Sequence, residues 1–591
     1  MSISSASYIA YSALMATQVQ MTVASANIAN ADTQGYTEKT ANQAAVYSSG
    51  AGAGVSITSI TGSVDQFLMK SLVGATSDLG SADSLNNYLN QLQSLYGNTI
   101  GDGTSGTSLG NTLASLESAI SSLANNPSDA SLGANVVQAL DTVASQLRQT
   151  SSGIQQLRGN VDQDIGSSVT DVNKQLQLID SLNKQIAQAS GSGQPTGDLE
   201  DQRNTALQDV ASKMDISYFT GANGSLQVYT ASGQALVDST AHALSYTPAA
   251  TVTAGMTYNP SSPGGFGGIM LNGMDITSQI TSGSIGALVS LRDTVLPGAQ
   301  SQLDQLADQL ATSLNAVHNQ GTSLPPPATL TGTAAVTSAT PLSGTGSVRI
   351  AVTDAQGNLV TSLDIPDLSS YSTVGDLVTK INSTTGLSAS IDSNGHLVIA
   401  ATGSGDGVAI NEMSSAVGAG GQGLSDWLGL NDLVTASGAS NFAVRSDILS
   451  NPGLLATSSL DSSASLTNGA QVLSPGSASI ANSLYSTMTG STDFSSVAGL
   501  GATTTSFADY AGDIVGNVAS KASQASDAYK SKQALQSTFS STMSSNSGVN
   551  LDEETARLSS LQNEYTASAE LLQVINQMFT ALMTAVQTAT A

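Results

Sequence analysis

The chain has 591 residues, with 43 acidic against 16 basic side chains, and a formal net charge of −27. So acidic a chain lacks the basic surface that binds phosphates, which excludes nucleic acid as its main partner and argues against an anionic membrane surface. It has no cysteine, so disulfides, thiolate metal sites and cysteine nucleophiles are excluded. Its length predicts about three or four domains.

The first 31 residues carry no charge and show a seven-residue repeat. Leu14, Met21 and Ile28 are one row, and a second row of small residues runs beside it. This spacing predicts a helix that buries a narrow seam against another helix. The stretch is too polar for a membrane span, and the first basic residue is Lys39, so a cleaved secretory signal is not expected.

A compact motif follows this helix, reading Asn-Ile-Ala-Asn-Ala-Asp-Thr-Gln-Gly-Tyr-Thr over residues 27–37. Asn30, Asp32 and Gly35 are expected to end the helix and turn the chain. Tyr36 is then expected to pack back as an anchor. The motif and its position resemble the N-terminal motif of the flagellar axial family, which comprises rod, hook and hook-associated proteins.

Helical patterns dominate the region up to residue 190. An apolar stripe from 132 to 186 predicts a helix on the order of 80 Å long, with Gly153 as a candidate bend. The charged run 198–203 forms either an exposed face or pairs with neighbouring helices. Its Asp-Gln-Arg sequence also resembles a motif of hook-associated proteins. Short strands are expected over about 216–280, followed by more helix.

Three prolines at 325–327 mark a domain boundary. Beyond them we expect a short helix over 374–382 and a β-hairpin turning at Asn394 and Gly395. This part is similar to the small β/α insert in outer domains of flagellins and hook-associated proteins. A helix is expected to return from Phe507 toward the C-terminus.

The C-terminal stretch from residue 548 predicts a second long amphipathic helix. Asn550 can cap it, acidic residues fill its first turn, and no charged residue follows Glu570. Its start and continuation resemble the C-terminal helix of hook-associated proteins. The expected seam comprises Leu551, Leu558, Leu561, Tyr565, Leu572, Ile575, Phe579, Leu582 and Val586.

No catalytic constellation is present in the sequence. The three histidines are scattered without a zinc-protease signature, and the glycines at 420–423 are read as a loop rather than a calcium-binding repeat. The acids at 552–554 are read as helix N-terminal charges. We therefore expect no enzyme activity, no cofactor and no metal.

The predicted fold class is multidomain α+β. It comprises long coiled-coil-like terminal helices, an elongated helical bundle with β segments, and a small β-rich outer insert. The expected domains are 1–54 with 548–591 for assembly, 55–324 with 441–547 for the bundle, including a β segment at about 216–280, and 325–440 for the insert.

The resemblance implies a structural subunit of the bacterial flagellum that self-assembles helically and joins hook to filament. It implies type III export and an extracellular location. The implied partners are further copies, the hook protein below, a second junction protein or the filament above, and a cytoplasmic export chaperone on the C-terminal helix. The residues expected to carry assembly are Leu14, Met21, Ile28, Asn30, Gly35 and Tyr36, together with the C-terminal seam.

The two uncharged ends are expected to be largely disordered in the monomer and to order when copies stack. Three other interpretations remain open at this point. One is a different axial protein, of the hook or rod type. Another is a secreted adhesin or effector that uses the same export route. A third is a translocator whose ends enter membranes, although few basic residues flank those ends.

Overall fold

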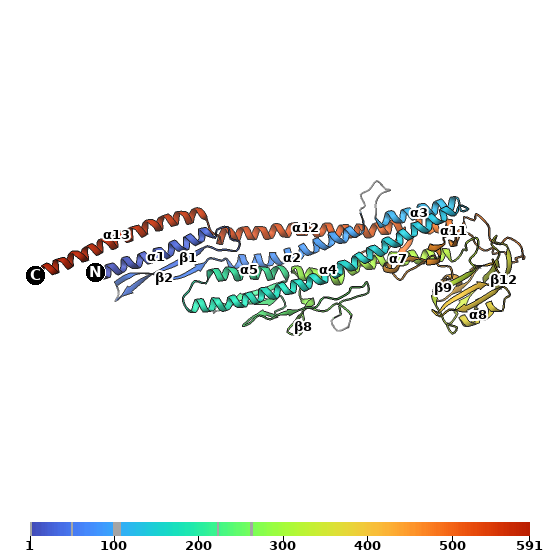
Figure 1. Ribbon diagram of the computed structural model, residues 1–591, viewed down its shortest axis with the longest axis horizontal. Coiled ribbons are helices and arrows are strands. Elements are labelled where there is room, and N and C mark those ends of the chain that lie inside the picture. The colour runs from blue at the N-terminus through green and yellow to red at the C-terminus, as the bar shows by residue number, and fades with distance from the viewer. Residues whose placement is uncertain (1–2, 49–50, 98–107, 222–223, 260–263, 591) are drawn as a thin grey trace.

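The computed structural model describes residues 3–48, 51–97, 108–221, 224–259 and 264–590. It is an elongated molecule whose long helices run along its length (Figure 1). Both chain ends lie at one tip, and the β-rich insert lies at the other. The mixed architecture, with long helices and several small antiparallel sheets, confirms the predicted fold class.

A helical bundle forms the shaft, and its longest member is α4 (Ala130–Gly191). The predicted apolar stripe of α4 is buried, because the other helices pack along it. α4 runs without a break through Gly153, the candidate bend. A Cβ there would lie 2.8 Å from Leu95 Cδ2, so Gly153 lets two helices approach closely. The other bundle helices are α2 (Gln66–Leu95), α3 (Leu109–Asn125), α5 (Gly197–Lys213), α6 (Gly283–Ser290), α7 (Leu296–His318), α11 (Ser479–Thr489) and α12 (Phe507–Ser547), with a π-helical turn at Leu291–Val295.

Short strands flank the shaft where the sequence predicted them. They form two small antiparallel sheets, β3-β4-β5 and β6-β7-β8. Two buried arginines hold this segment to the bundle: Arg158 Nη2 donates to the Met256 carbonyl at 2.6 Å, and Arg292 lies 4.8 Å from the Phe266 ring centroid. The strands are β3 (Ile216–Thr220), β4 (Leu226–Thr230), β5 (Ala235–Val237), β6 (Leu244–Ser245), β7 (Met270–Leu271) and β8 (Met274–Asp275), followed by a 3₁₀ turn at Thr277–Gln279.

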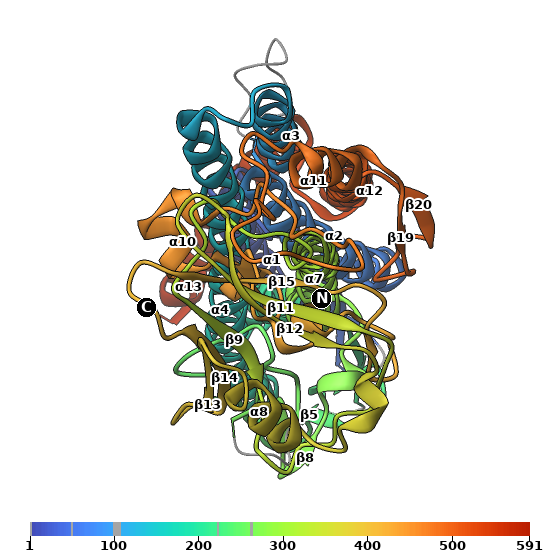
Figure 2. The same ribbon diagram turned by 90° about the vertical axis from the view of Figure 1, so that its right-hand side faces the viewer.

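The insert contains two three-stranded antiparallel sheets, ordered β12-β11-β15 and β13-β14-β9, which face the viewer in Figure 2. The predicted hairpin is β13-β14, and Gly395 at its turn has φ +87°. The insert elements are β9 (Thr329–Ala335), β10 (Gly344–Thr345), β11 (Val348–Thr353), β12 (Leu359–Ile365), α8 (Val374–Asn382), β13 (Leu387–Ile391), β14 (His396–Ala401), β15 (Gly407–Asn411), β16 (Ala416–Val417) and α9 (Leu424–Leu428).

Short elements lead from the insert back to α12. Leu460, Val472 and Leu473 within this return segment pack against the insert strands β11 and β15. The remaining elements are β17 (Val434–Thr435), β18 (Ala443–Val444), α10 (Ser446–Ser450), β19 (Thr492–Phe494) and β20 (Thr503–Thr505), with 3₁₀ turns at Leu368–Ser370, Ala439–Asn441 and Pro452–Leu454.

The tip opposite the insert is made by both ends of the chain. α1 (Ile3–Ala29) and α13 (Leu551–Thr590) pack side by side and run in opposite directions, with the hairpin β1 (Lys39–Ser48) and β2 (Ala51–Gly62) beside α1 (Figure 1). Among the described residues, none of the helices combines the length and apolarity that a membrane crossing requires.

Candidate assembly site

The inner face of α13 carries most of the predicted C-terminal seam. Leu561 and Ile575 are buried, and Leu558, Tyr565 and Leu572 are half-buried. These positions are spaced by three, four, seven and three residues along the helix, which places them on one face, as a helix–helix seam requires. The structure therefore brings this part of the predicted set together.

The single chain covers only part of the predicted seam. Leu551, Phe579 and Leu582 are 46%, 52% and 50% exposed, so these three residues are not buried within one molecule. α13 has 40 residues and α1 has 27, so at 1.5 Å per residue α13 is about 20 Å longer. Its last turns therefore extend past α1 (Figure 1).

α1 buries the small row of its seam. Ala10, Thr17 and Ala24 are buried, whereas Leu14, Met21 and Ile28 are half-buried. Small side chains let helix backbones approach closely. Both ends are helical in the structure, which differs from the expectation of disordered ends, because each end partly covers the other within one chain.

The N-terminal motif folds back on the end of α1 through Asn27. Asn27 Nδ2 donates to the Lys39 carbonyl at 2.9 Å, and its Oδ1 accepts from the Lys39 amide at 3.0 Å and from Tyr36 Oη at 2.9 Å. Asn30 Nδ2 donates to the Ala26 carbonyl at 2.9 Å, which helps to end the helix as predicted. Tyr36 is therefore the anchor that the sequence indicated, and Asp32 is exposed.

Asp201 on α5 joins this motif to the shaft. Its carboxylate accepts from the Thr37 amide at 2.9 Å, from Thr37 Oγ1 at 2.8 Å, and from Lys39 Nζ. Lys39 Nζ also donates to the carbonyl oxygen and Oγ1 of Thr37, at 3.0 and 2.9 Å. All three ammonium donors are thereby used. We call Asn27, Tyr36, Thr37, Lys39 and Asp201 the polar joint.

The polar joint is shielded from water. The Lys39 and Asp201 side chains are buried, and Lys39 Nζ lies 4.6 Å from the Tyr36 ring centroid, within cation–π range. Burial, followed by the negative charges of Asp198 and Asp201, raises the pKa of Tyr36 to about 12. Tyr36 therefore stays protonated and keeps donating to Asn27 at physiological pH.

A second contact ties the motif to the turn between α12 and α13. The Glu38 amide donates to the Ser547 carbonyl at 2.8 Å. Arg557 Nη1 lies 3.7 Å from Glu38 Oε1 and 3.4 Å from Glu554 Oε1, and Glu554 is buried. Burial, followed by the charge of Glu554, raises the pKa of Glu38. Both chain ends and the shaft thus meet around residues 36–39.

Gly35 has a backbone conformation that the turn requires. Its φ is +83°, and a Cβ built on it would lie 2.7 Å from Thr205 Oγ1 on α5. We expect Gly35→Ala to destabilise the protein by about 1–2 kcal/mol through φ alone, with the contact adding to this. Thermal unfolding of Gly35→Ala, Thr205→Ala and Gly35→Ala/Thr205→Ala would separate the two causes. The Thr205→Ala variant alone measures the loss of the hydrogen bond from Thr205 Oγ1 to the Asp201 carbonyl at 3.1 Å. Equal melting temperatures for Gly35→Ala and the unchanged chain would contradict the expectation.

Sequence reasoning missed the roles of Thr37 and Lys39. A signal was present, because Lys39 is the first basic residue and directly follows the motif. The sequence of the charged run 198–203 is compatible with either an exposed face or pairing with neighbouring helices. Asp201 and Arg203 are both buried. Asp201 forms an ion pair with Lys39, and Arg203 Nη1 donates to Asn183 Oδ1 at 3.0 Å. Within the described parts of the chain, no group of three or more metal-ligating side chains is found.

Three family models match the chain. The flagellar hook-associated protein FlgK helical domain matches residues 89–331, the flagella basal body rod protein model matches 8–37, and the flagellin hook IN motif matches 347–403. The rod-protein match covers most of α1 and the motif that contributes Asn27, Tyr36 and Thr37 to the polar joint. The IN-motif match covers the centre of the insert.

The chain is also similar to curated relatives. Flagellar hook-associated protein 1 of Escherichia coli (strain K12) is 24% identical over 589 residues, covering 97% of this chain and 98% of the relative. The protein of that name from Bacillus subtilis (strain 168) is 26% identical over 351 residues, covering 52% and 66%. A solved structure, the flagellar hook junction protein FlgK from Burkholderia pseudomallei, aligns with TM-score 0.49 and 17% identity, covering 80% of this chain and 99% of that one.

Paired terminal helices, a rod-type N-terminal motif and a long helical shaft define an axial structural protein of the bacterial flagellum. Within that class, the chain is similar over nearly its whole length to flagellar hook-associated protein 1. These similarities identify a structural protein of the flagellum rather than an enzyme.

Proposed function

We propose that this protein builds the junction by helical self-assembly through α1 and α13. The hook protein would lie on one side, and a second junction protein or the filament on the other. The observation that carries this is the uncovered end of α13, where Phe579, Leu582 and Val586 are each about half exposed. No charged residue follows Glu570, so this end can be buried without desolvating a charge.

Burial of these side chains would supply a driving force for assembly. Fully burying a Leu, Val or Phe side chain contributes roughly 1.5–3 kcal/mol, so several such residues per copy outweigh a modest ordering cost. The same apolar end would be a liability in the cytoplasm before export. We therefore propose that an export chaperone covers α13 until the chain leaves the cell.

Three domains fit this function. The terminal assembly domain comprises 1–54 and 548–591, and we extend it through Gly62 because β2 pairs with β1 beside α1. The shaft was expected over 55–324 with 441–547; with this extension it begins at residue 63, and it would act as a stiff spacer. The insert, 325–440, lies at the far tip and would face solvent (Figure 2).

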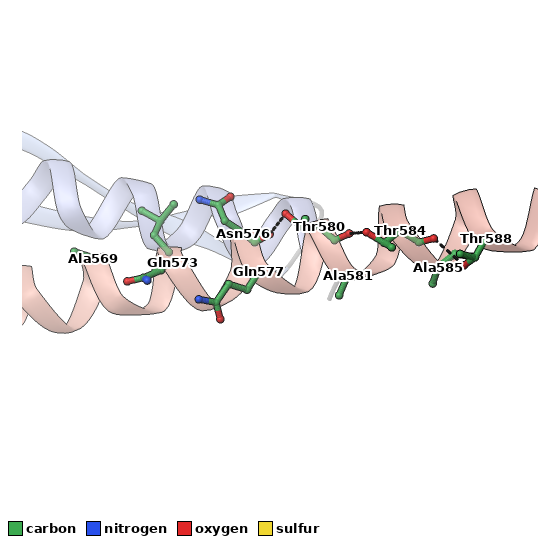
Figure 3. Close-up of a pocket in the computed structure, with 10 residues that line it drawn as sticks. Ala569, Gln573, Asn576, Gln577, Thr580, Ala581, Thr584, Ala585 and Thr588 are labelled. Atoms are coloured by element: carbon green, nitrogen blue, oxygen red, sulfur yellow. Dashed lines mark hydrogen bonds between the residues drawn. The ribbon is translucent and has the colours of Figure 1, made fainter.

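Electron microscopy of a strain lacking the gene tests the function. We expect hooks without filaments, restored by the full chain but not by a Phe579→Glu/Leu582→Glu variant, because assembly would have to bury two carboxylates. The matched control is Gln573→Glu/Gln577→Glu, which adds the same charge to the face of α13 shown in Figure 3. We expect this control to restore filaments. Normal filaments in the deletion strain would instead favour a secreted adhesin or effector.

A further inference from the structure

A half-buried carboxyl group lies where the insert sheet meets α9. Glu412 directly follows β15, an outer strand of one of the two insert sheets, and its side chain reaches the start of α9. Its Oε1 accepts from the Asp426 amide at 3.0 Å. A Cβ built on Gly423 would lie 2.1 Å from Glu412 Oε2, so the carboxyl packs directly against the backbone of this glycine.

The segment around α9 connects the insert to the end of the shaft. The leucines of α9 lie in the insert core, whereas Ser425 Oγ donates to Asn319 Oδ1, just beyond α7, at 2.7 Å. The Asn431 amide donates to the same oxygen at 2.9 Å, and Asn319 Nδ2 donates to Asp432 Oδ1 at 2.7 Å. A shift of α9 would therefore change the contacts that hold the insert on the shaft.

A glycine-rich turn leads into α9 beside this carboxyl. The Val417 amide donates to the Gln422 carbonyl at 2.7 Å, and the Gln422 amide donates to the Val417 carbonyl at 3.1 Å, which closes the turn. Gly418 and Gly421 within it have φ of +69° and +63°. A Cβ on Gly418 would lie 3.2 Å from Trp427 Nε1, so the indole of α9 packs on this turn. Glycine backbone is conformationally permissive, so the turn can follow a movement of α9.

The charged side chain that faces Glu412 has the same sign. It is Asp426 of α9, which is held in place by Gln422, whose Nε2 donates to Asp426 Oδ2 at 3.0 Å. Neither β15 nor the glycine-rich turn contributes a titratable side chain. Farther along the chain, Asp432 acts on Asp426, and the charge of Arg445 acts on Asp432. The carboxyl of Glu412 therefore faces a second carboxyl group on the helix that it contacts.

Opposing effects act on the ionisation of Glu412. Burial raises its pKa, the amide of Asp426 lowers it, the charge of Asp426 raises it and the amide of Ser425 lowers it. Together they raise the pKa of Glu412 to about 7. The protonated group is neutral and stays against Gly423 without a charge to desolvate. The ionised group is a partly desolvated charge beside a second carboxylate, which favours its movement into water.

We propose that Glu412 is a proton-controlled latch between β15 and α9. The protonated carboxyl stays packed on Gly423 and holds α9 in place. The ionised carboxyl moves into solvent, and the glycine-rich turn lets α9 and Trp427 move with it. Because α9 also contacts Asn319, the seating of the insert on the shaft changes with the pH around the protein. This device belongs to the insert and does not depend on assembly through α1 and α13.

The direction of the effect on stability follows from the folded and unfolded pKa values of Glu412. An unfolded glutamate has a pKa of about 4.3. Between that pH and about pH 7, the folded chain binds more protons at this group than the unfolded chain. The stability that Glu412 contributes is therefore complete at acid pH and is lost as the pH rises through about 7.

The fluorescence of Trp427, the single tryptophan of the full chain, tests the latch. We expect the emission of the native protein to change in one transition centred near pH 7, while the circular dichroism stays constant. Glu412→Gln cannot ionise, so it should keep the acid-form emission throughout and lose the transition. Glu117→Gln is the matched control, because Glu117 is a shaft carboxyl whose pKa burial also raises. This control should keep the transition of the parent.

Hydrogen exchange separates movement from titration alone. After correction for the intrinsic effect of pH, exchange of the peptide covering residues 418–428 should be faster on the alkaline side in the parent than in Glu412→Gln. Asp426→Asn removes the facing charge, so its transition should move to lower pH. A transition that persists unchanged in Glu412→Gln would overturn the proposal, and so would an unchanged midpoint in Asp426→Asn. A fluorescence change without faster exchange would overturn it as well, because α9 would then not have moved.

Discussion

Lys39→Met is expected to destabilise the polar joint by about 3–5 kcal/mol, the usual cost of removing one partner from a buried ion pair. The variant leaves the Asp201 carboxylate buried without its cation, although Thr37 still donates to it. The joint is the direct link between the N-terminal motif and α5, so local unfolding there would free the assembly domain from the shaft.

Urea titration combined with hydrogen exchange of the peptide covering residues 27–39 would measure this loss. Lys184→Met is the matched control, because its pair with Asp180 has a similar chemistry, with 2.7 Å between Nζ and Oδ2, but an exposed lysine. Exposed pairs contribute only about 0–1 kcal/mol. Similar losses in the free energy of unfolding of the two variants would contradict a stabilising role for the buried Lys39–Asp201 pair. Asp201→Asn with Lys39→Met should cost less than the sum of the single changes.

Acid is expected to weaken the connection between the shaft and the insert through His318. This histidine, at the end of α7, is fully buried: its Nδ1 bonds to the Asn431 carbonyl at 2.6 Å, and its Nε2 accepts from the Ala456 amide at 2.8 Å. Since Nε2 accepts, the ring is neutral and Nδ1 carries the proton. Burial lowers the pKa of His318 to about 4, because protonation would desolvate a charge and break the bond from Ala456.

The direction of the pH effect on stability follows from the difference between the folded and unfolded pKa values of His318. The unfolded chain has a histidine pKa of about 6.5, so between pH 6.5 and 4 the unfolded state binds more protons than the folded state. Stability is therefore lost as pH falls through this window, by about 3 kcal/mol at about 1.4 kcal/mol per pKa unit.

Denaturant titrations at pH 7 and pH 4, followed by the fluorescence of Trp427, would measure the effect, since this single tryptophan packs against the insert core. The acids of the chain also titrate in this range, so the test is the difference between the parent chain and His318→Gln. We expect the parent to lose about 3 kcal/mol more than the variant. Identical pH dependence of the parent and His318→Gln would contradict the assignment.

Much of the fold was predictable because local sequence patterns specify its elements. The stripe over 132–186, the cap and apolar face of 374–382, and the Asn394–Gly395 turn each specify an element through neighbours only a few residues away. The helix stop at Asn30 and the anchor Tyr36 were predictable for the same reason. The contact between Lys39 and Asp201 could not be predicted, because the two residues lie 162 positions apart in the sequence and no local rule pairs them.

The sequence by itself determined that both ends of this protein are amphipathic helices with long uncharged stretches, because a seven-residue repeat and the absence of charge are properties of the chain alone. Only the tertiary structure decided which repeats are covered. Leu561 and Leu582 are at equivalent positions of the repeat, yet one is buried and the other exposed, because α13 extends past α1. The covered rows hold the two ends together within one molecule, and the uncovered rows remain for another.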